Sequence, residues 1–307
     1  MKRGKNQEPR LIGRILNEKY RVLCEIGRGG MGVVYEAEDV DTLRPLAVKT
    51  LRPNSDEGLE LSKRFEREAY VQSMLKHPNI VEVESMGVLE EGTLYLVMEK
   101  VSGKSLDRLI QDGVIGPRKV LVMARQVLLA LHFAHQHGVI HRDLKPENIM
   151  LVRVGEPGKQ FDRVKLIDFG LVKMADSIAP GLGMTKLTRT GIVYGTPAYM
   201  APEQAQGRPL DGRTDLYALG VTMFEALTGR CPFIGDGPVD VVRKHIKKPP
   251  PRLVDIAPNA AYCTAQMEYL ISKALAKKPE ARFADARAMT EALDEAFQSI
   301  GHLPAED

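Results

Sequence analysis

The spacing of the apolar residues changes once along this chain of 307 residues, close to Val101–Gly103. Before that point, short runs that alternate or stay apolar over strand lengths predict a sheet. These runs are Tyr20–Ile26, Val34–Glu38, Pro45–Leu51, Ile80–Val83 and Leu94–Met98. Apolar residues that recur every three or four positions predict helices. Such spacing occurs at Leu59–Leu75 in the first part, and at Val120–Leu131, Asp215–Leu227, Met267–Ala276 and Ala286–Phe297 in the second. We therefore expect an α+β protein with an antiparallel sheet and one helix in a first lobe and a mostly helical second lobe.

Charge and composition exclude several classes of protein. The 43 Lys and Arg residues nearly balance the 40 Asp and Glu residues, for a net charge of +3. A dedicated nucleic-acid binder usually has a strong basic excess. No run reaches the roughly 18 apolar residues of a membrane helix, and the basic N-terminus lacks the apolar core of a secretory signal. Three widely spaced cysteines indicate neither a disulfide framework nor a zinc site. We expect a cytoplasmic protein with no membrane segment and no nucleic-acid partner.

A glycine cluster at Gly27–Gly32 has the pattern G-x-G-x-x-G. Alone this pattern fits either a dinucleotide-binding turn or a glycine-rich hairpin without a ligand. A dinucleotide-binding turn requires a helix directly after the third glycine, whereas Val33-Val34-Tyr35 predicts a strand. The sequence therefore favours a hairpin that covers phosphate groups, because glycine lets backbone N–H groups approach the oxygens closely.

Lys49 lies in an apolar strand, directly after Ala47-Val48. It is either a surface lysine whose stem packs on apolar neighbours, or a lysine that faces phosphates and needs a carboxylate to hold it. In the helix predicted after this strand, Glu68 lies next to the apolar face and is the candidate for that carboxylate.

The run His141–Asn148 is almost entirely polar, yet it lies between a predicted buried helix and the predicted strand Ile149–Val152. It is either a solvated loop or a loop that carries chemistry. Twenty positions after Asn148, Asp168 follows another apolar run, Leu166-Ile167. Asp143, Asn148 and Asp168 together offer a proton acceptor and oxygen ligands of the kind that Mg²⁺ prefers.

Taken together, these motifs resemble those of the protein kinase superfamily. The glycine loop, Ala47-Val48-Lys49, His141–Asn148, Asp168-Phe169-Gly170 and Ala201-Pro202-Glu203 occur in the family's order. The resemblance extends from Tyr20 to Phe297. It implies a bilobal kinase domain over residues 20–297, with lobes at about 20–101 and 102–297, a basic arm at 1–19 and a tail at 298–307.

The resemblance also implies roles for individual residues. Asp143 is the implied base for the substrate hydroxyl, and Lys145 is implied to neutralise the transferred phosphoryl group. Lys49 is implied to bind phosphate and to pair with Glu68. Asn148 and Asp168 are the implied ligands of Mg²⁺, with Mn²⁺ as an alternative. The residues implied to contact ATP are Ile26, Gly27, Arg28, Gly29, Gly30, Met31, Gly32, Val33, Val34, Ala47, Lys49, Met98, Glu99, Val101 and Met150. The implied structural residues are Glu203 paired with Arg282, and Asp215, which is implied to hold the catalytic loop.

Further details are similar to the bacterial eukaryotic-like (Hanks-type) serine/threonine kinases, including Lys145 two residues after Asp143 and the run Gly195–Tyr199. The resemblance implies Ser/Thr residues of proteins as substrates; the alternative is an inactive pseudokinase scaffold. Arg142 directly before Asp143 implies activation by autophosphorylation, in trans within a homodimer. The expected phosphosites are Thr190 and then Thr188, with Arg142 and Lys173 as the phosphate pocket, and Thr196 is expected on the substrate side.

Overall fold

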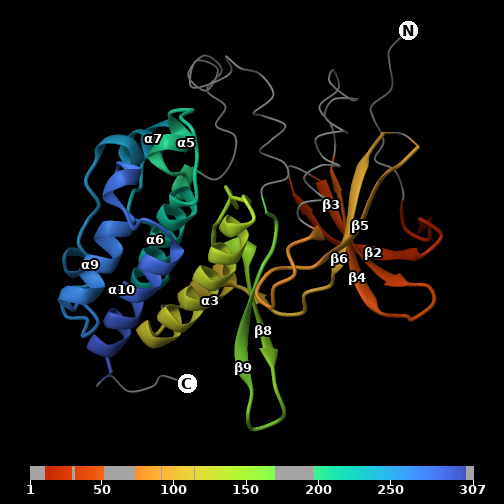
Figure 1. The fold of residues 1–307 in the computed structure, drawn as a ribbon, viewed down its shortest axis with the longest axis horizontal. Coiled ribbons are helices and arrows are strands. Elements are labelled where there is room, and N and C mark those ends of the chain that lie inside the picture. Colours follow the sequence, from red (N-terminus) through yellow and green to blue (C-terminus); the bar gives the residue numbers. More distant parts are fainter. Residues whose placement is uncertain are drawn as a thin grey trace. The chain divides into compact units, whose positions relative to one another are not determined.

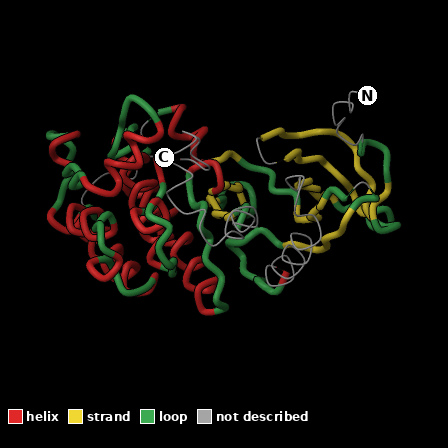
Figure 2. Tube along the Cα trace, turned by 90° about the horizontal axis from the view of Figure 1, so that it is seen from above, coloured by secondary structure: helices red, strands yellow, loops and turns green. Residues whose placement is uncertain are grey.

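A computed structural model of the chain describes residues 11–29, 32–51, 73–90, 92–113, 115–169 and 197–301. The chain divides into two compact units. The first takes in residues up to Met74 together with Glu82–Val101, and the second takes in Leu75–Val81 and the chain from Ser102 onward. Figure 2 shows the larger helices of the described chain in the second unit and most of its strands in the first.

The first unit is built on an antiparallel sheet that has six strands in the described ranges, in the order β1-β2-β3-β4-β6-β5. The strands are β1 (Ile15–Leu16), β2 (Tyr20–Gly29), β3 (Gly32–Asp39), β4 (Pro45–Leu51), β5 (Val83–Val88) and β6 (Leu94–Glu99). Along β3 buried and half-buried residues alternate, as expected for a strand with one face on a core.

The strand β2 contains two irregularities, one of which the sequence pattern reflects. Its pairing with β3 shifts register between Val22 and Cys24 and again between Glu25 and Gly27. The residues passed over are Leu23 and Ile26, whose side chains are 37% and 49% exposed. Leu23 is the residue at which the alternation of the sequence breaks. A residue inserted into one strand leaves the ladder locally unpaired, so an apolar residue there is not required to face the core.

The two faces of this sheet have different neighbours. Val33, Tyr35, Val48 and Val97 belong to a buried apolar cluster of the first unit. Residues that pair across strands share a face, and so do residues two positions apart. The register pairs Val34 with Lys49, and Ala47 with Met98. These four residues therefore lie on the face opposite that cluster.

The second unit is mostly helical in its described part. Its helices are α2 (Leu106–Asp112), α3 (Pro117–Gln136), α5 (Pro202–Ala205), α6 (Arg213–Thr228), α7 (Pro238–Lys247), α8 (Leu253–Ile256), α9 (Ala265–Ala274) and α10 (Ala286–Ser299), with short 3₁₀ turns η1 (Pro146–Asn148), η3 (Pro197–Tyr199) and η4 (Pro279–Ala281). Three short strands, β7 (Lys104–Ser105), β8 (Ile149–Val154) and β9 (Phe161–Leu166), form a small antiparallel sheet. Helices α3, α6, α9 and α10 pack on one another around a common apolar core (Figure 1).

One predicted strand is wrong. The run Ile80–Val83 is not a strand; β5 begins only at Val83, opposite Met98. Ile80 instead makes a single parallel bridge with Leu166 and packs in the core of the second unit. Asn79 holds this segment there, because its side-chain amide donates to the carbonyl of Val164 at 2.8 Å. An apolar run reports burial, and it does not identify the partner against which it is buried.

The other strands and helices predicted within the described ranges agree with the structure, whereas the expected N-terminal arm contains β1, which pairs with β2. An antiparallel sheet precedes a helical part, which confirms the predicted α+β class. The strand Pro45–Leu51 has the predicted bounds, and the ends of the four helices predicted in the second part differ from those of α3, α6, α9 and α10 by at most five residues. Most of the helix predicted at Leu59–Leu75 lies outside the described residues.

Candidate active site

The loop His141–Lys145 is held by the carboxylate of Asp215, at the start of α6. Asp215 is fully buried. Its Oδ2 accepts from the backbone N–H of His141 at 2.8 Å and lies 2.8 Å from Nε2 of His135, and its Oδ1 accepts from the backbone N–H of Arg142 at 2.9 Å. A carboxylate that accepts several N–H groups away from water forms strong, directional hydrogen bonds. The loop backbone is therefore fixed to α6 at two consecutive residues.

His141 connects this loop to the segment that carries Asp168. Its ring is fully buried and lies 4.5 Å from the ring of Phe169, centroid to centroid. Burial lowers the pKa of His141 and favours the neutral ring. A neutral ring can donate from Nε2 to the carbonyl of Ile167 at 3.1 Å and accept at Nδ1 from the N–H of Asp143 at 3.4 Å. One side chain thus contacts both segments that carry the predicted site carboxylates.

The carboxylate of Asp143 lies among polar groups from its own loop. Its Oδ2 is 3.3 Å from Nζ of Lys145 and 3.4 Å from Nδ2 of Asn148. The same amide nitrogen donates to the backbone carbonyl of Asp143 at 2.8 Å. Asn148 is buried in the short turn η1, whereas the side chains of Asp143 and Lys145 are 16% and 20% exposed. The structure therefore brings together these three predicted site residues.

Asn148 and Asp168 have the donor chemistry that a magnesium ion requires. The backbone carbonyl of Asn148 accepts from the N–H of Ile167 at 3.0 Å, which places Asn148 beside the residue that precedes Asp168. Because Nδ2 of Asn148 donates to Asp143, its amide oxygen is the atom left to act as a ligand. One carboxylate and one amide oxygen, completed by water and phosphate oxygens, suit Mg²⁺. The residues present fit the metal ion that the resemblance implies.

Two backbone conformations at this site are unusual. Arg142 has φ +62° and Asp168 has φ +59°, although neither is glycine. A non-glycine residue in this region costs about 1–2 kcal/mol, and such residues persist where the surrounding contacts hold them, often at functional sites. The two residues adjoin or carry the carboxylates described above, which supports a functional reading of the site.

The segment Ala201–Ala205 is fixed by a buried ion pair. Arg282 donates from Nη1 and Nη2 to the two carboxylate oxygens of Glu203, each at 2.7 Å, and both residues are at most 4% exposed. Glu203 also accepts from the hydroxyl of Thr214 at 2.9 Å. Next to this pair, the side chain of Gln204 donates to the carbonyl of Arg142 at 2.8 Å.

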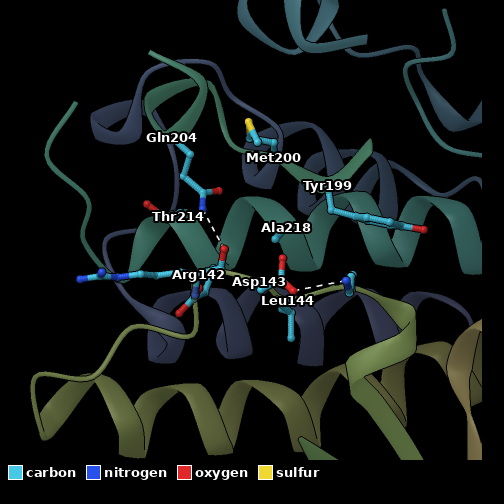
Figure 3. A pocket seen from close by; sticks show the side chains of 10 residues that line it. Arg142, Asp143, Leu144, Tyr199, Met200, Gln204, Thr214 and Ala218 are labelled. Atoms are coloured by element: carbon cyan, nitrogen blue, oxygen red, sulfur yellow. Dashed lines mark hydrogen bonds and ion pairs between the residues drawn. The ribbon is translucent and has the colours of Figure 1, made fainter. Parts of the chain in front are cut away.

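These elements surround a small pocket in the second unit, which Figure 3 shows from close by. Asp143 and Lys145 line it from the loop His141–Lys145, and Tyr199, Met200 and Gln204 line it from the segment that follows residue 196. The hydroxyl of Tyr199 donates to Oε2 of Glu225 at 2.5 Å, which joins the turn η3 to α6.

The predicted nucleotide contacts of the first unit follow the hairpin of β2 and β3. Gly29 pairs with Gly32 and Gly27 with Val34, so the glycine run is a hairpin followed by a strand. Ile26 is half exposed, and Arg28 forms an exposed ion pair with Glu25 at 2.6 Å. Val33 differs from its predicted neighbours, since its side chain is 3% exposed and packs in the core of the sheet.

The remaining predicted contacts are distributed between both units. Ala47 and Met98 are buried; Lys49, Glu99, Val101 and Met150 are half-buried. The backbone N–H of Glu99 donates to the carbonyl of Glu82 at 3.0 Å. Seven predicted site residues lie outside the described ranges: Gly30, Met31, Glu68, Lys173, Thr188, Thr190 and Thr196.

Sequence reasoning missed two residues that the structure places at the site. His135 contacts Asp215, and Gln204 contacts Arg142. A signal existed for His135, which lies four residues after Leu131 and so on the buried side of α3. A histidine there requires a polar partner. No comparable signal exists for Gln204, whose partner is 62 residues away in the chain.

Comparisons with known proteins agree with this geometry. Residues 20–297 match the family of the protein kinase domain. The chain is 43% identical to serine/threonine-protein kinase pkn3 of Myxococcus xanthus over 279 residues, which cover 90% of this chain and 50% of that protein. It is 37% identical to serine/threonine-protein kinase PrkC of Bacillus subtilis over 290 residues, 94% of this chain and 42% of that one. The chain thus spans about half the length of these relatives.

A solved structure gives the same result for the fold. The kinase domain of Mycobacterium tuberculosis PknI superposes with a TM-score of 0.71 and 30% identity, covering 93% of this chain and 99% of that one. Within the described ranges, no helix has both the length and the apolar character needed to cross a membrane. The chain carries a serine/threonine protein kinase domain, and it belongs to the protein kinase family, whose members use ATP and a divalent metal ion.

Proposed function

We propose that this chain transfers the γ-phosphoryl group of ATP to serine and threonine hydroxyls of proteins, with Mg²⁺ as the metal ion. The observation that carries the proposal is the position of Asp143. Its carboxylate lies 3.3 Å from Nζ of Lys145, in a loop that buried Asp215 holds at two backbone N–H groups. The names of the relatives as serine/threonine-protein kinases support the choice of acceptor.

In this proposal Asp143 orients the substrate hydroxyl and accepts its proton. Phosphoryl transfer requires mainly positioning and stabilisation of charge, with little covalent chemistry by the protein. Lys145 is the protein cation beside Asp143, and it neutralises negative charge on the transferred group. Asn148 and Asp168 would hold the metal ion, which when bound neutralises charge on the phosphate oxygens. Lys49, on the sheet face opposite the core of the first unit, would bind the phosphates.

The proposal includes activation by autophosphorylation at Thr190, and secondarily at Thr188. Both residues lie outside the described ranges, so this part depends on the resemblance. A phosphate there would add about two negative charges, which Arg142 and Lys173 would bind. Two copies of the chain would phosphorylate each other. Site mapping by mass spectrometry should find phosphate on Thr190 in wild-type protein; a fully active Thr188→Ala/Thr190→Ala variant without phosphate would contradict this activation mechanism.

A phosphotransfer assay tests the proposed activity. The purified chain is incubated with Mg²⁺ and γ-labelled ATP, with and without a generic basic protein, and the labelled residues are identified. We expect label on serine or threonine that depends on the metal ion and is retained when Mn²⁺ replaces Mg²⁺. The second candidate, a pseudokinase scaffold, predicts no label on either protein under any metal condition. Label on tyrosine alone would contradict the proposed acceptor.

A further inference from the structure

Gln204 connects the segment after the pocket to the backbone of the catalytic loop. It lies in the short helix α5, next to Glu203. Its Oε1 accepts from the backbone N–H of Ala201 at 3.0 Å, and its Nε2 donates to the backbone carbonyl of Arg142 at 2.8 Å. Figure 3 shows the second of these hydrogen bonds, with the side chain directed from α5 to the loop. Both ends of the amide are therefore used, and its orientation is determined.

The carbonyl that Gln204 binds belongs to a residue in an unfavourable conformation. Arg142 has φ +62°, a region that residues other than glycine rarely adopt. Its N–H donates to Asp215 at 2.9 Å and its C=O accepts from Gln204 at 2.8 Å. The two peptide groups that flank the Cα of Arg142 are thus held by side chains from two other elements, α6 and α5. Such a backbone conformation persists only where surrounding contacts determine it.

The peptide group that Gln204 holds also contains the N–H of Asp143. Rotation of this group would change ψ of Arg142 and φ of Asp143, and it would therefore move the Asp143 side chain relative to Lys145, which now lies 3.3 Å from its Oδ2. A second hydrogen bond of this peptide, from the N–H of Asp143 to Nδ1 of His141, is long at 3.4 Å. Gln204 therefore provides the shorter of these two hydrogen bonds to the peptide group before the proposed base.

We propose that Gln204 is a positioning residue, which orients the Asp143 carboxylate through the carbonyl of Arg142. The proposal rests on the role proposed above for Asp143. The proposal gives Gln204 no contact with the nucleotide. Loss of the Gln204 side chain should therefore lower kcat and leave the KM for ATP nearly unchanged. An error of about 1 Å in a catalytic group can reduce a rate by 10²-fold. We expect a loss in kcat of roughly 10-fold to 100-fold.

The experiment compares three variants of the full chain. Gln204→Met keeps the length of the side chain and removes both hydrogen bonds. Gln204→Glu keeps the acceptor for Ala201 N–H and replaces the donor to Arg142 by an oxygen. Gln206→Met is the matched control, because Gln206 is half-buried at the end of α5 and no side-chain hydrogen bond of it is found within the described part of the chain. All rates are measured well below the thermal midpoint of each variant.

We expect kcat to fall in both Gln204 variants and not in the control, with the KM for ATP within about twofold of wild type. Equal kcat in Gln204→Glu and wild type would overturn the proposal, because that variant cannot donate to Arg142. A loss of rate that only follows a lower folded fraction would also overturn it, since it would show a structural role alone.

Hydrogen exchange provides a readout that does not need activity. The peptide that contains Arg142 and Asp143 should exchange its amide protons faster in Gln204→Met than in Gln206→Met. Equal exchange would overturn the proposed contact. If the wild-type chain transfers no phosphoryl group, the proposed function fails, and the exchange comparison still decides whether Gln204 holds this backbone.

Discussion

Removal of the Arg282 guanidinium leaves the buried carboxylate of Glu203 with the hydroxyl of Thr214 as its one remaining hydrogen-bond donor among the described residues. In the native structure Glu203 accepts two hydrogen bonds of 2.7 Å from Arg282 and one of 2.9 Å from Thr214. The side chain of Arg282 is 0% exposed. Arg282→Met keeps much of the aliphatic stem and removes every donor. Because an uncompensated buried charge is costly, we expect the free energy of unfolding to fall by about 3–5 kcal/mol.

A double-mutant cycle separates the ion pair from the packing around it. Glu203→Met alone leaves Arg282 with backbone carbonyls of Ala276, Arg213 and Lys277 as acceptors, so its cost should be smaller than that of Arg282→Met. The double variant has no buried charge at this position and should cost less than the sum of the single changes. We expect a coupling of about 2–3 kcal/mol in urea unfolding, within the range for residues in direct contact.

The exposed pair of Arg287 and Glu291 in α10 is the matched control. Its side chains are 78% and 68% exposed and lie 3.5 Å apart, and exposed pairs contribute little to stability. The same cycle at this pair should give a coupling near zero. A coupling at Arg282 and Glu203 as small as that at the exposed pair would refute the view that this buried pair fixes α5.

Three further changes should alter stability in defined directions. Leu43 is 64% exposed and has φ +57°, a conformation that is strained for residues other than glycine. Leu43→Gly should therefore raise the free energy of unfolding by about 1 kcal/mol and shift the urea midpoint upward; an unchanged or lower midpoint would contradict the strain. Burial and the charge of Arg282 lower the pKa of Lys277 to about 7, from an ordinary value of 10.5. Between pH 7 and pH 10.5 Lys277 is therefore protonated in the unfolded chain and neutral in the folded one, so the free energy of unfolding rises with pH across this range. Lys277→Met should therefore stabilise the protein at pH 7, by about 1–2 kcal/mol after allowance for partial exposure, and the gain should shrink toward pH 10; an equal gain at both would refute the assignment. Burial also raises the pKa of Glu225 above 4.5, so the wild type loses stability as pH rises through the folded pKa, and thermal melts of Glu225→Gln from pH 4 to 7 should lack this loss.

Much of the fold follows from local pattern. The strand Pro45–Leu51 and the helices α3, α6, α9 and α10 have strong periodicity, and they occur where the sequence predicts them. The break at Leu23 marks a real irregularity of β2. The strand predicted at Ile80–Val83 is wrong, because Ile80 is buried in the core of the second unit and bridges Leu166, 86 residues later in the chain, and only Val83 pairs in the first sheet.

The candidate site likewise has a part that the sequence predicts and a part that only the structure shows. The residue types that carry the proposed chemistry are close in sequence, since Asp143, Lys145 and Asn148 occupy one loop. The contacts that hold this loop come from distant residues: Asp215 is 73 positions from Arg142, and Gln204 is 62 positions away. Spacing along the chain contains no information about such pairs, so the backbone of Arg142 and its partner Gln204 could be found only in the structure.

The kinetics of Asp143→Asn test the proposed function most directly. The change preserves size and removes the proton acceptor, and a general base contributes about 10²–10⁴-fold to a rate. We predict that the rate of phosphotransfer to a generic protein falls by at least about 10²-fold. The apparent affinity for ATP with Mg²⁺, measured from the thermal stabilisation that the ligand gives, should stay within about twofold of wild type. Asp294→Asn is the control, because Asp294 forms an exposed pair with Arg125 in α3, and it should behave like wild type. Near-normal phosphotransfer by the Asp143→Asn variant would contradict the account.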